Sequence, residues 1–179
     1  MTSDVRRAQL VAFSIVVMWS MVAMSAETAE QEPLAGSYKY VGGDAQVKAL
    51  YASVEGVVKK MNFFVRGIAR KRLRKPNMPS AELYLTISPT TITVAQTGRV
   101  TVVAPWDGTP MKWRSPEGTF TVTHVIDDGI LLQTMDGKNS HSTNRFVLDE
   151  DGVTLKVRTK IVSSRLPGPV VFVMTYRKK

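Results

Sequence analysis

Two hydrophobic periodicities divide the chain. Between residues 44 and 75 apolar residues recur every three or four positions, which is the pattern of an amphipathic helix. From Ala81 onward the period is two, in short segments separated by Gly, Pro and Asp. Residues 34–41 form an earlier segment of strand character. The pattern predicts one strand, a helical segment, and then about eight or nine antiparallel strands.

The helical segment contains its own start and stop signals. Asp44 and Asn62 are candidate N-caps, because their side-chain oxygens can accept hydrogen bonds from the first free amides of a helix. Gly67 weakens the middle of the pattern, and Pro76 ends it. These signals favour two helices joined by a tight turn over one long helix.

The strand pattern bounds the fold class. Regular short strands with turn signals are typical of a barrel or a sandwich. A sandwich rarely places about 30 helical residues between its first and second strands, whereas a barrel can use them as a lid. We therefore expect a mainly β protein, an antiparallel up-and-down β-barrel of about 9–10 strands with the helical segment inserted after the first strand.

Alternation within the strands predicts a shared inner face. Aromatic residues and a few polar ones fall on matching positions of three segments, at Phe120, His124, Asn144, Phe146, Phe172 and Tyr176. Aromatic walls with a few polar groups suit a small amphipathic ligand. A packed core with a hydrogen-bonded His and Tyr fits the same pattern equally well.

A basic cluster lies in the second half of the helical segment. It carries eight cations and no acidic residue, at Lys59, Lys60, Arg66, Arg70, Lys71, Arg72, Arg74 and Lys75. This nearly accounts for the net charge of +9. Basic residues interleaved with Phe63, Phe64 and Ile68 are typical of a helix that contacts an anionic membrane or glycan. A solvated helix surface is the alternative, and nucleic acid is disfavoured because no nucleic-acid-binding module is visible.

The N-terminus resembles a secretory signal peptide. Arg6 and Arg7 precede a 15-residue apolar run, and small residues follow around Ser25 and Ala26. Such a run is shorter than the roughly 20 residues that span a bilayer, which favours a cleaved signal over an anchor. We predict a signal peptide at 1–26, a flexible spacer at 27–33 and one domain at 34–179, exported to a periplasm or secreted. The absence of Cys means that this domain depends on its core rather than on disulfides.

Signals for catalysis are weak. The two His residues are too few for the common zinc sites, and no hydrolase, zinc-protease or phosphate-loop motif is present. Residues 140–142 and 149–152 are interpreted as hairpin turns rather than as a nucleophile pair or a calcium loop. We predict a protein that is not an enzyme, with no metal site and no cofactor.

The order of elements, together with the C-terminal sequence VMTYRK (residues 173–178), resembles the fatty-acid-binding-protein and lipocalin group, the calycins. The resemblance implies a single barrel whose Tyr176 points at a bound carboxylate. The family's Arg two residues earlier is replaced by Met174, and Arg158 lies on the polar side of its strand. The carboxylate site of the family is therefore incomplete here.

Two hypotheses follow. The first is an exported, non-enzymatic binding protein for a hydrophobic or amphipathic, lipid-like small molecule, with a basic helical lid that contacts an anionic membrane or glycan. The second is a structural or interaction protein of the cell envelope, with a filled barrel and no ligand. Export argues against nucleic acid as a partner in either case.

Overall fold

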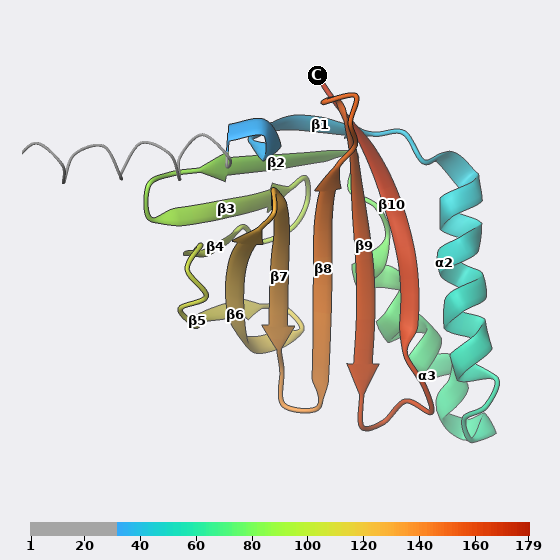
Figure 1. Cartoon of the computed structure of the whole chain (residues 1–179). Coiled ribbons are helices and arrows are strands. Elements are labelled where there is room, and N and C mark those ends of the chain that lie inside the picture. Colours follow the sequence, from blue (N-terminus) through green and yellow to red (C-terminus); the bar gives the residue numbers. More distant parts are fainter. Residues whose placement is uncertain (1–31) are drawn as a thin grey trace, which may run out of the picture.

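The computed structural model describes residues 32–179 (Figure 1). A short 3-10 turn at Glu32–Leu34 leads into the first strand, and a second one, η2, at Lys75–Asn77 follows the helices. The helices are α2 (Gly43–Val58) and α3 (Phe63–Arg74). The strands are β1 (Gly36–Tyr40), β2 (Glu82–Ile87), β3 (Thr91–Gln96), β4 (Val102–Pro105), β5 (Met111–Ser115), β6 (Gly118–Asp127), β7 (Ile130–Asp136), β8 (Ser140–Leu148), β9 (Thr154–Ser163) and β10 (Val170–Lys178). The predicted signal peptide and most of the predicted spacer lie outside the described residues.

The ten strands form one antiparallel up-and-down sheet that curls into a nearly closed barrel. The first strand pairs with both β2 and the last strand, so that Tyr40 lies opposite Tyr176. The remaining gap lies between β4 and β5, the two ends of the strand order. Across it, the indole N–H of Trp113 donates to the carbonyl of Thr101 at 2.8 Å. The predicted fold class, with two helices after the first strand, is confirmed.

Helix α2 covers an open strand edge. The first strand pairs only with the C-terminal end of β10, at residues 176–178. The earlier amides of β10 therefore have no strand partner on that side. Gln46 Oε1 accepts from the amide of Thr175 at 2.8 Å, and Ser53 Oγ accepts from the amide of Val171 at 3.0 Å. These two side chains are seven residues apart, which places them on one face of the helix. The helix thus replaces a longer first strand.

The N-cap of α2 differs from the predicted one, whereas the N-cap of α3 agrees with it. The N-cap of α2 is Gly42, with no side-chain hydrogen bond, and Asp44 lies within the first turn. The prediction that Asp44 is the cap was therefore wrong. Its carboxylate is still favourable there, because the N-terminus of a helix is its positive end. Asn62 does cap α3, since its Oδ1 accepts from the amide of Phe64 at 3.1 Å, and two helices form, as favoured.

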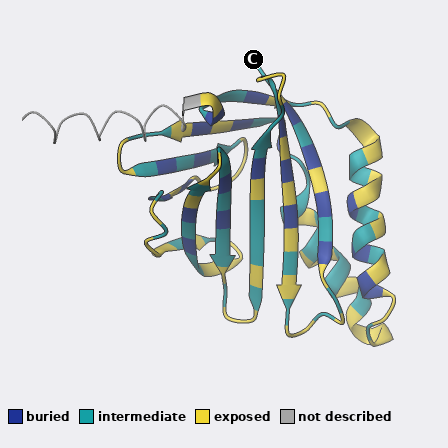
Figure 2. Cartoon of the chain, viewed as in Figure 1, coloured by how far each residue is buried: buried dark blue, intermediate teal, exposed yellow. Residues whose placement is uncertain are grey.

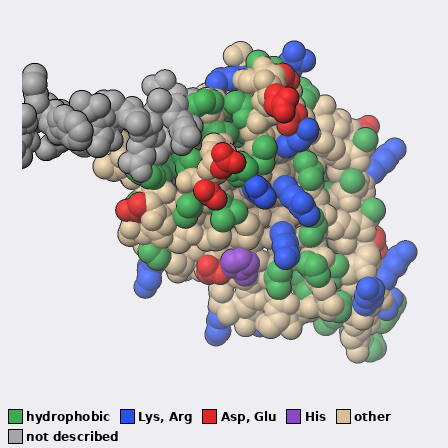
Figure 3. Space-filling model, viewed as in Figure 1, with side chains coloured by type: hydrophobic (Ala, Val, Ile, Leu, Met, Phe, Trp, Pro, Cys, Tyr) green, Lys and Arg blue, Asp and Glu red, His purple; other side chains and the backbone are tan. Residues whose placement is uncertain are grey.

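Alternation along the strands separates the two sides of the barrel wall (Figure 2). On β9, Leu155 and Val157 are buried, whereas Lys156, Arg158 and Lys160 are exposed. The outer face of the sheet accordingly carries scattered lysine and arginine side chains (Figure 3). Arg158 points outward, as its sequence parity predicted.

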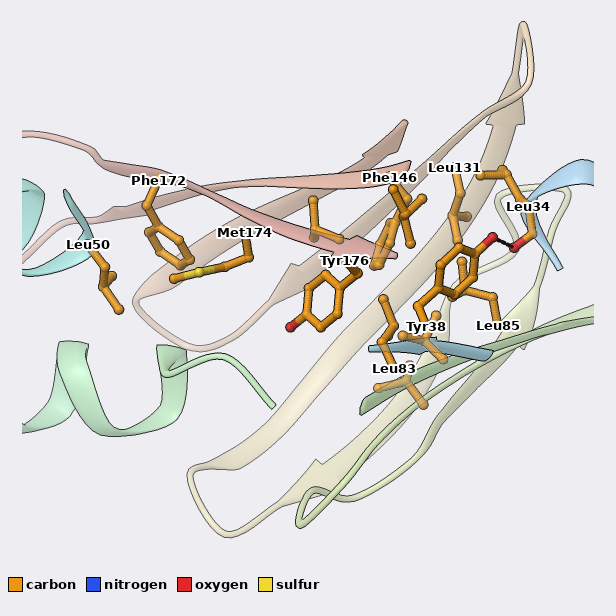
Figure 4. Close-up of a cluster of buried hydrophobic side chains, with 14 of the residues drawn as sticks. Leu34, Tyr38, Leu50, Leu83, Leu85, Leu131, Phe146, Phe172, Met174 and Tyr176 are labelled. Carbon is orange, nitrogen blue, oxygen red and sulfur yellow. Dashed lines mark hydrogen bonds between the residues drawn. The ribbon is translucent and has the colours of Figure 1, made fainter. Parts of the chain in front are cut away.

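The core fills one end of the barrel more tightly than the other. Leu83, Leu131 and Leu155 are completely buried around Tyr38, as Figure 4 shows for several of these residues. The hydroxyl of Tyr38 donates to the carbonyl of Leu34 at 2.7 Å, and burial raises its pKa to about 12. Toward the β7–β8 turn, by contrast, inward-facing residues are only partly buried. They are Phe120, Met135, Ser142 and Ile161.

Candidate ligand-binding site

The inner wall of the barrel brings together all six predicted pocket residues. They come from three strands: Phe120 and His124 from β6, Asn144 and Phe146 from β8, and Phe172 and Tyr176 from β10. Four of them are nearly fully buried, with exposed fractions between 0% for His124 and 7% for Phe172. Phe120 and Asn144 are half-buried. Phe172, Met174 and Tyr176 follow one another along the same side of β10 in Figure 4.

A row of four polar side chains crosses this wall. His124, Gln133, Asn144 and Thr159 lie directly opposite one another on β6, β7, β8 and β9. The hydroxyl of Thr159 donates to Asn144 Oδ1 at 2.7 Å, and Asn144 Nδ2 donates to Gln133 Oε1 at 2.8 Å. Gln133 Nε2 then lies 2.9 Å from His124 Nε2. We call these four residues the polar row.

Sequence reasoning identified His124 and Asn144 but missed Gln133 and Thr159. The signal was present, because Gln133 and Thr159 each sit two residues from an inward apolar neighbour. A Gln or Thr on an alternating strand is usually solvated, so their inward position did not by itself mark these two residues as part of a site. Which polar residues meet one another depends on the pairing register of four strands.

His124 is the most constrained member of the polar row. Its side chain is completely buried, and its Nδ1 has no hydrogen-bond partner among the described residues. Burial lowers the pKa of His124, and the nearby carbonyls of Ala104 and Ile92 offset part of that effect. The ring is therefore neutral at neutral pH, and Gln133 donating to Nε2 places the ring proton on Nδ1.

The buried interior lacks formal charge. Among the buried residues of the described chain, the polar ones are Ser80, His124, Gln133 and Thr159. Tyr176 is buried against the edge of the Tyr40 ring, with centroids 5.6 Å apart, and burial raises its pKa. The positive charge of Arg99, an exposed residue of the β3–β4 turn, opposes this rise. Burial in turn lowers the pKa of Arg99, so one cation of the described chain lies close to the buried Tyr176 although the residue as a whole is exposed.

Three of the eight predicted patch cations hold the helices together. Arg70 Nε and Arg74 Nη2 donate to Glu55 on α2 at 2.6 and 2.7 Å, and the hydrogen bond from Arg70 lowers the pKa of that carboxyl. Arg74 also lies over the Tyr51 ring, 4.4 Å from its centroid. Arg66 donates to the backbone carbonyls of Met61 and Lys59, at 2.9 and 2.8 Å. All three are half-buried.

The other five cations are exposed. They are Lys59, Lys60, Lys71, Arg72 and Lys75. Between them, the first turns of α3 present Phe63, Phe64 and Ile68, which are 76%, 85% and 59% exposed. Lysine, arginine and hydrophobic side chains lie side by side at the lower right of Figure 3, over the ends of the helices. We call the three apolar residues and the five cations the α3 surface.

The two turns that could have suggested chemistry have structural explanations. Asp151 of the β8–β9 turn accepts from the amides of Val153 and Thr154 and from the Thr154 hydroxyl, which lowers its pKa to about 2. The prediction of a polar turn at residues 140–142 was wrong, since these residues begin β8. His141 there pairs with Asp136 at 2.6 Å on the exposed outer face.

Residues 32–179 contain no group of three His, Cys, Asp or Glu side chains that could hold a metal ion. Neither helix there is both long and apolar enough to span a membrane. A shallow hollow beside the β8–β9 turn is lined by residues 147–151 and includes none of the predicted pocket residues.

Comparisons with known proteins address the fold. No protein-family model matches the chain, and no curated protein does either. A solved structure described as the REP1-NXSQ fatty acid transporter matches with a TM-score of 0.50 and 16% identity, over 82% of this chain and 96% of that one. A Schistosoma mansoni fatty acid binding protein, in complex with arachidonic acid, matches with a TM-score of 0.50 and 12% identity, over 84% and 98%.

A mutant of the fluorescent protein UnaG gives a third match, with a TM-score of 0.50, 12% identity, and coverage of 83% and 97%. At these identities the likeness shows a shared fold. The described chain is a barrel of the fatty-acid-binding-protein type, as the resemblance in its sequence implied.

Proposed function

We propose that this chain is an exported, non-enzymatic protein that binds a hydrophobic or amphipathic small molecule in its barrel. The observation that carries the proposal is the inner wall, which is apolar, uncharged, and only partly buried toward the β7–β8 turn at Phe120, Met135 and Ile161. Apolar walls with a few convergent polar groups are the usual lining of small-molecule sites in barrels. Met174 and Phe172 extend this lining along β10.

The α3 surface would bring the barrel to an anionic membrane. Large apolar side chains exposed on a helix gain free energy when they enter an apolar phase, about 1.5–3 kcal/mol for a fully buried Phe. Each Lys or Arg near an anionic bilayer adds about 1 kcal/mol. Phe63 and Phe64 therefore provide the apolar contact, and the five exposed cations provide the charge attraction. An anionic glycan would satisfy the cations alone.

The location is part of the proposal. The apolar run before Ser25 and the small residues that follow it support export through a cleaved signal. A periplasmic or secreted binding protein would meet lipid at an envelope surface. N-terminal sequencing of the protein recovered from its native compartment tests this location. We expect the mature chain to start near Glu27.

Ligand binding is tested by identifying the lipids that co-purify with the mature protein. The chain beginning at Glu27 is purified, extracted with organic solvent and analysed by mass spectrometry, beside two variants at adjacent positions. Ile161→Trp fills the partly buried inner wall, whereas Val162→Trp adds the same ring to the outer face, where Val162 is 40% exposed. We expect lipid in the wild type and in V162W, and its loss from I161W. Lipid-free wild-type protein that also binds no added fatty acid or alcohol would contradict the proposal.

A second candidate function is a structural or interaction protein of the envelope with a filled barrel. The near-complete burial of Tyr38, Leu83, Leu131 and Phe146, all at most 1% exposed, favours it. In that case the α3 surface contacts a partner or a membrane, while I161W changes stability and leaves that contact intact. Circular dichroism and envelope sedimentation of the same variants separate the two functions.

A further inference from the structure

The polar row is unusual because it lies in the middle of an otherwise apolar wall. Its members are consecutive cross-strand partners on four neighbouring strands, and His124, Gln133 and Thr159 are at most 7% exposed. Burying polar groups costs free energy unless they are hydrogen-bonded. Hydrogen bonds within the row offset this cost, yet some of its hydrogen-bond donors have no acceptor among the described residues.

The direction of its hydrogen bonds leaves donors unused. Asn144 accepts from Thr159 and donates one amide hydrogen to Gln133, and its second amide hydrogen has no partner in the described part of the chain. Gln133 in turn donates to His124 Nε2. Within residues 32–179 the proton on His124 Nδ1 has no partner at hydrogen-bonding distance, although the carbonyls of Ala104 and Ile92 lie near enough to affect the ring. Asn144 is also the half-buried member of the row, so the wall beside it is less tightly packed.

The charge of the surroundings limits what could accept these hydrogen bonds. No Lys or Arg is among the buried residues of the described chain, and Met174 lies on the inner face of β10. An ionised carboxylate beside the polar row would lose its hydration without gaining a cation, which is strongly unfavourable. An uncharged acceptor has no such penalty, since its lost water contacts are replaced by the free N–H groups.

We infer that the polar row is the recognition site for an uncharged hydrogen-bonding head group, such as a primary amide, an ester or an alcohol, on an amphipathic ligand. The inference rests on the proposed function, since it names the ligand class of that same barrel. Asn144 is the contact residue, and Gln133, Thr159 and His124 hold its amide in place. The alkyl part of the ligand lies along the partly buried wall at Phe120, Met135 and Ile161.

The competing arrangement places a carboxylate at the rim. The Arg99 residue is exposed, but burial of its guanidinium lowers its pKa. The guanidinium donates to the carbonyl of Met78, and its charge acts on Tyr176. A fatty acid held in this way would point its tail at the polar row, where an alkyl chain gains nothing from free N–H groups. The two arrangements predict opposite preferences between a neutral and an anionic head group.

The experiment compares two ligands that differ only in the head group. Delipidated mature protein is titrated with hexadecanamide and with hexadecanoate at pH 7.4, with displacement of the neutral dye Nile red as the signal. We expect the amide to bind at least tenfold more tightly. Asn144→Leu, which keeps the side-chain shape, should weaken amide binding five- to tenfold and should not weaken hexadecanoate binding. The control Thr143→Val, on the outer face of the same strand, should change neither.

Each other outcome has a defined meaning. Tighter binding of hexadecanoate that Arg99→Gln abolishes would overturn the inference while the proposed function stands. Absence of binding by both ligands, with no co-purifying lipid, defeats the proposed function, and the inference falls with it. Where N144L does not fold, nitrogen-15 NMR of His124 in the wild type decides. We expect an Nδ1–H tautomer whose signal shifts on addition of hexadecanamide, and an unshifted signal contradicts the inference.

Discussion

Gln46 on α2 holds Thr175 on β10 by two hydrogen bonds at once. Its Oε1 accepts from the Thr175 amide at 2.8 Å, and its Nε2 donates to the Thr175 hydroxyl at 2.7 Å. These groups are 129 residues apart in the chain. A side-chain amide imitates the neighbouring strand that β1 is too short to provide, and α2 is thereby fixed along the edge of the barrel.

Replacing Gln46 should therefore loosen the end of the barrel. In Gln46→Leu the part-buried Thr175 amide loses its partner. An unsatisfied buried group costs about 1–3 kcal/mol, and we expect a loss near the lower end because water reaches part of this site. Urea unfolding should show this loss, and hydrogen exchange of the Thr175 amide should accelerate. Lys48→Leu, at an exposed position of the same helix, is the control. Equal effects of the two variants would mean that Gln46 acts only through helix propensity.

Glu55 should make a pH-dependent contribution to stability. Its pKa lies below the ordinary 4.5 in the folded state because Arg70 and Arg74 bind the carboxylate. A lowered folded pKa stabilises the fold above about pH 4.5, and this stabilisation disappears as the pH falls through the folded pKa. Glu55→Gln should cost at most about 1 kcal/mol at pH 7, since the partners are partly solvated.

The measurement for Glu55 is urea unfolding at pH 7 and pH 3, where the difference between wild type and E55Q should shrink. Asp44→Asn, at an exposed acidic position in the first turn of α2, is the control for the loss of one negative charge. A difference that is the same at both pH values would show that the Glu55 carboxylate is not held by the arginines.

The α3 surface should attract the protein to anionic lipid through position rather than through net charge. The double variant Lys71→Glu, Arg72→Glu should reduce binding to phosphatidylglycerol vesicles more than tenfold, since each cation contributes about 1 kcal/mol. Arg158→Glu, Lys160→Glu changes the net charge equally on the outer face of β9 and should have little effect. Vesicle sedimentation at physiological salt measures both.

A further variant and a second ligand in the same assay show which groups of the α3 surface bind and what they bind. Phe64→Ser should weaken vesicle binding with the charge unchanged, because Phe64 is 85% exposed and available to insert. Equal losses in the two double variants would mean that overall charge governs binding. Binding to a sulfated polysaccharide that K71E/R72E abolishes, with no binding to vesicles, would assign the surface to a glycan.

His124 should make the protein less stable in mild acid. Burial lowers its pKa below 6.5, so the unfolded chain takes up a proton at a pH where the folded chain does not. Stability is therefore highest above about pH 6.5 and falls as the pH drops toward the folded pKa, by about 1.4 kcal/mol for each unit of pKa difference. His124→Gln should flatten the dependence of the unfolding free energy on pH between pH 7 and pH 5, as measured by urea unfolding at both pH values.

Several features were predictable from neighbouring residues alone. The alternation in residues 119–126 placed Phe120 and His124 on the inner face, and Asn62 marked the start of the second helix. These features depend on local backbone periodicity and on a hydrogen bond that spans two residues. Asp44 failed as a cap because the helix begins at Gly43, with Gly42 as its N-cap two residues before Asp44. A barrel of about 9–10 strands followed from the same local patterns summed along the chain.

Tertiary structure decided the pairing between distant residues. Nothing in the sequence distinguished the eight cations of the helical segment from one another. In the structure, Glu55 on the preceding helix binds Arg70 and Arg74 in ion pairs. Gln133 and Thr159 were inconspicuous until the register of β6 to β9 aligned them with His124 and Asn144. Register and helix packing are set by long-range burial, in which each residue's partner depends on the whole fold. The sequence by itself therefore determined which side of each strand faces inward, and the tertiary structure decided which polar groups meet there and which cations remain free.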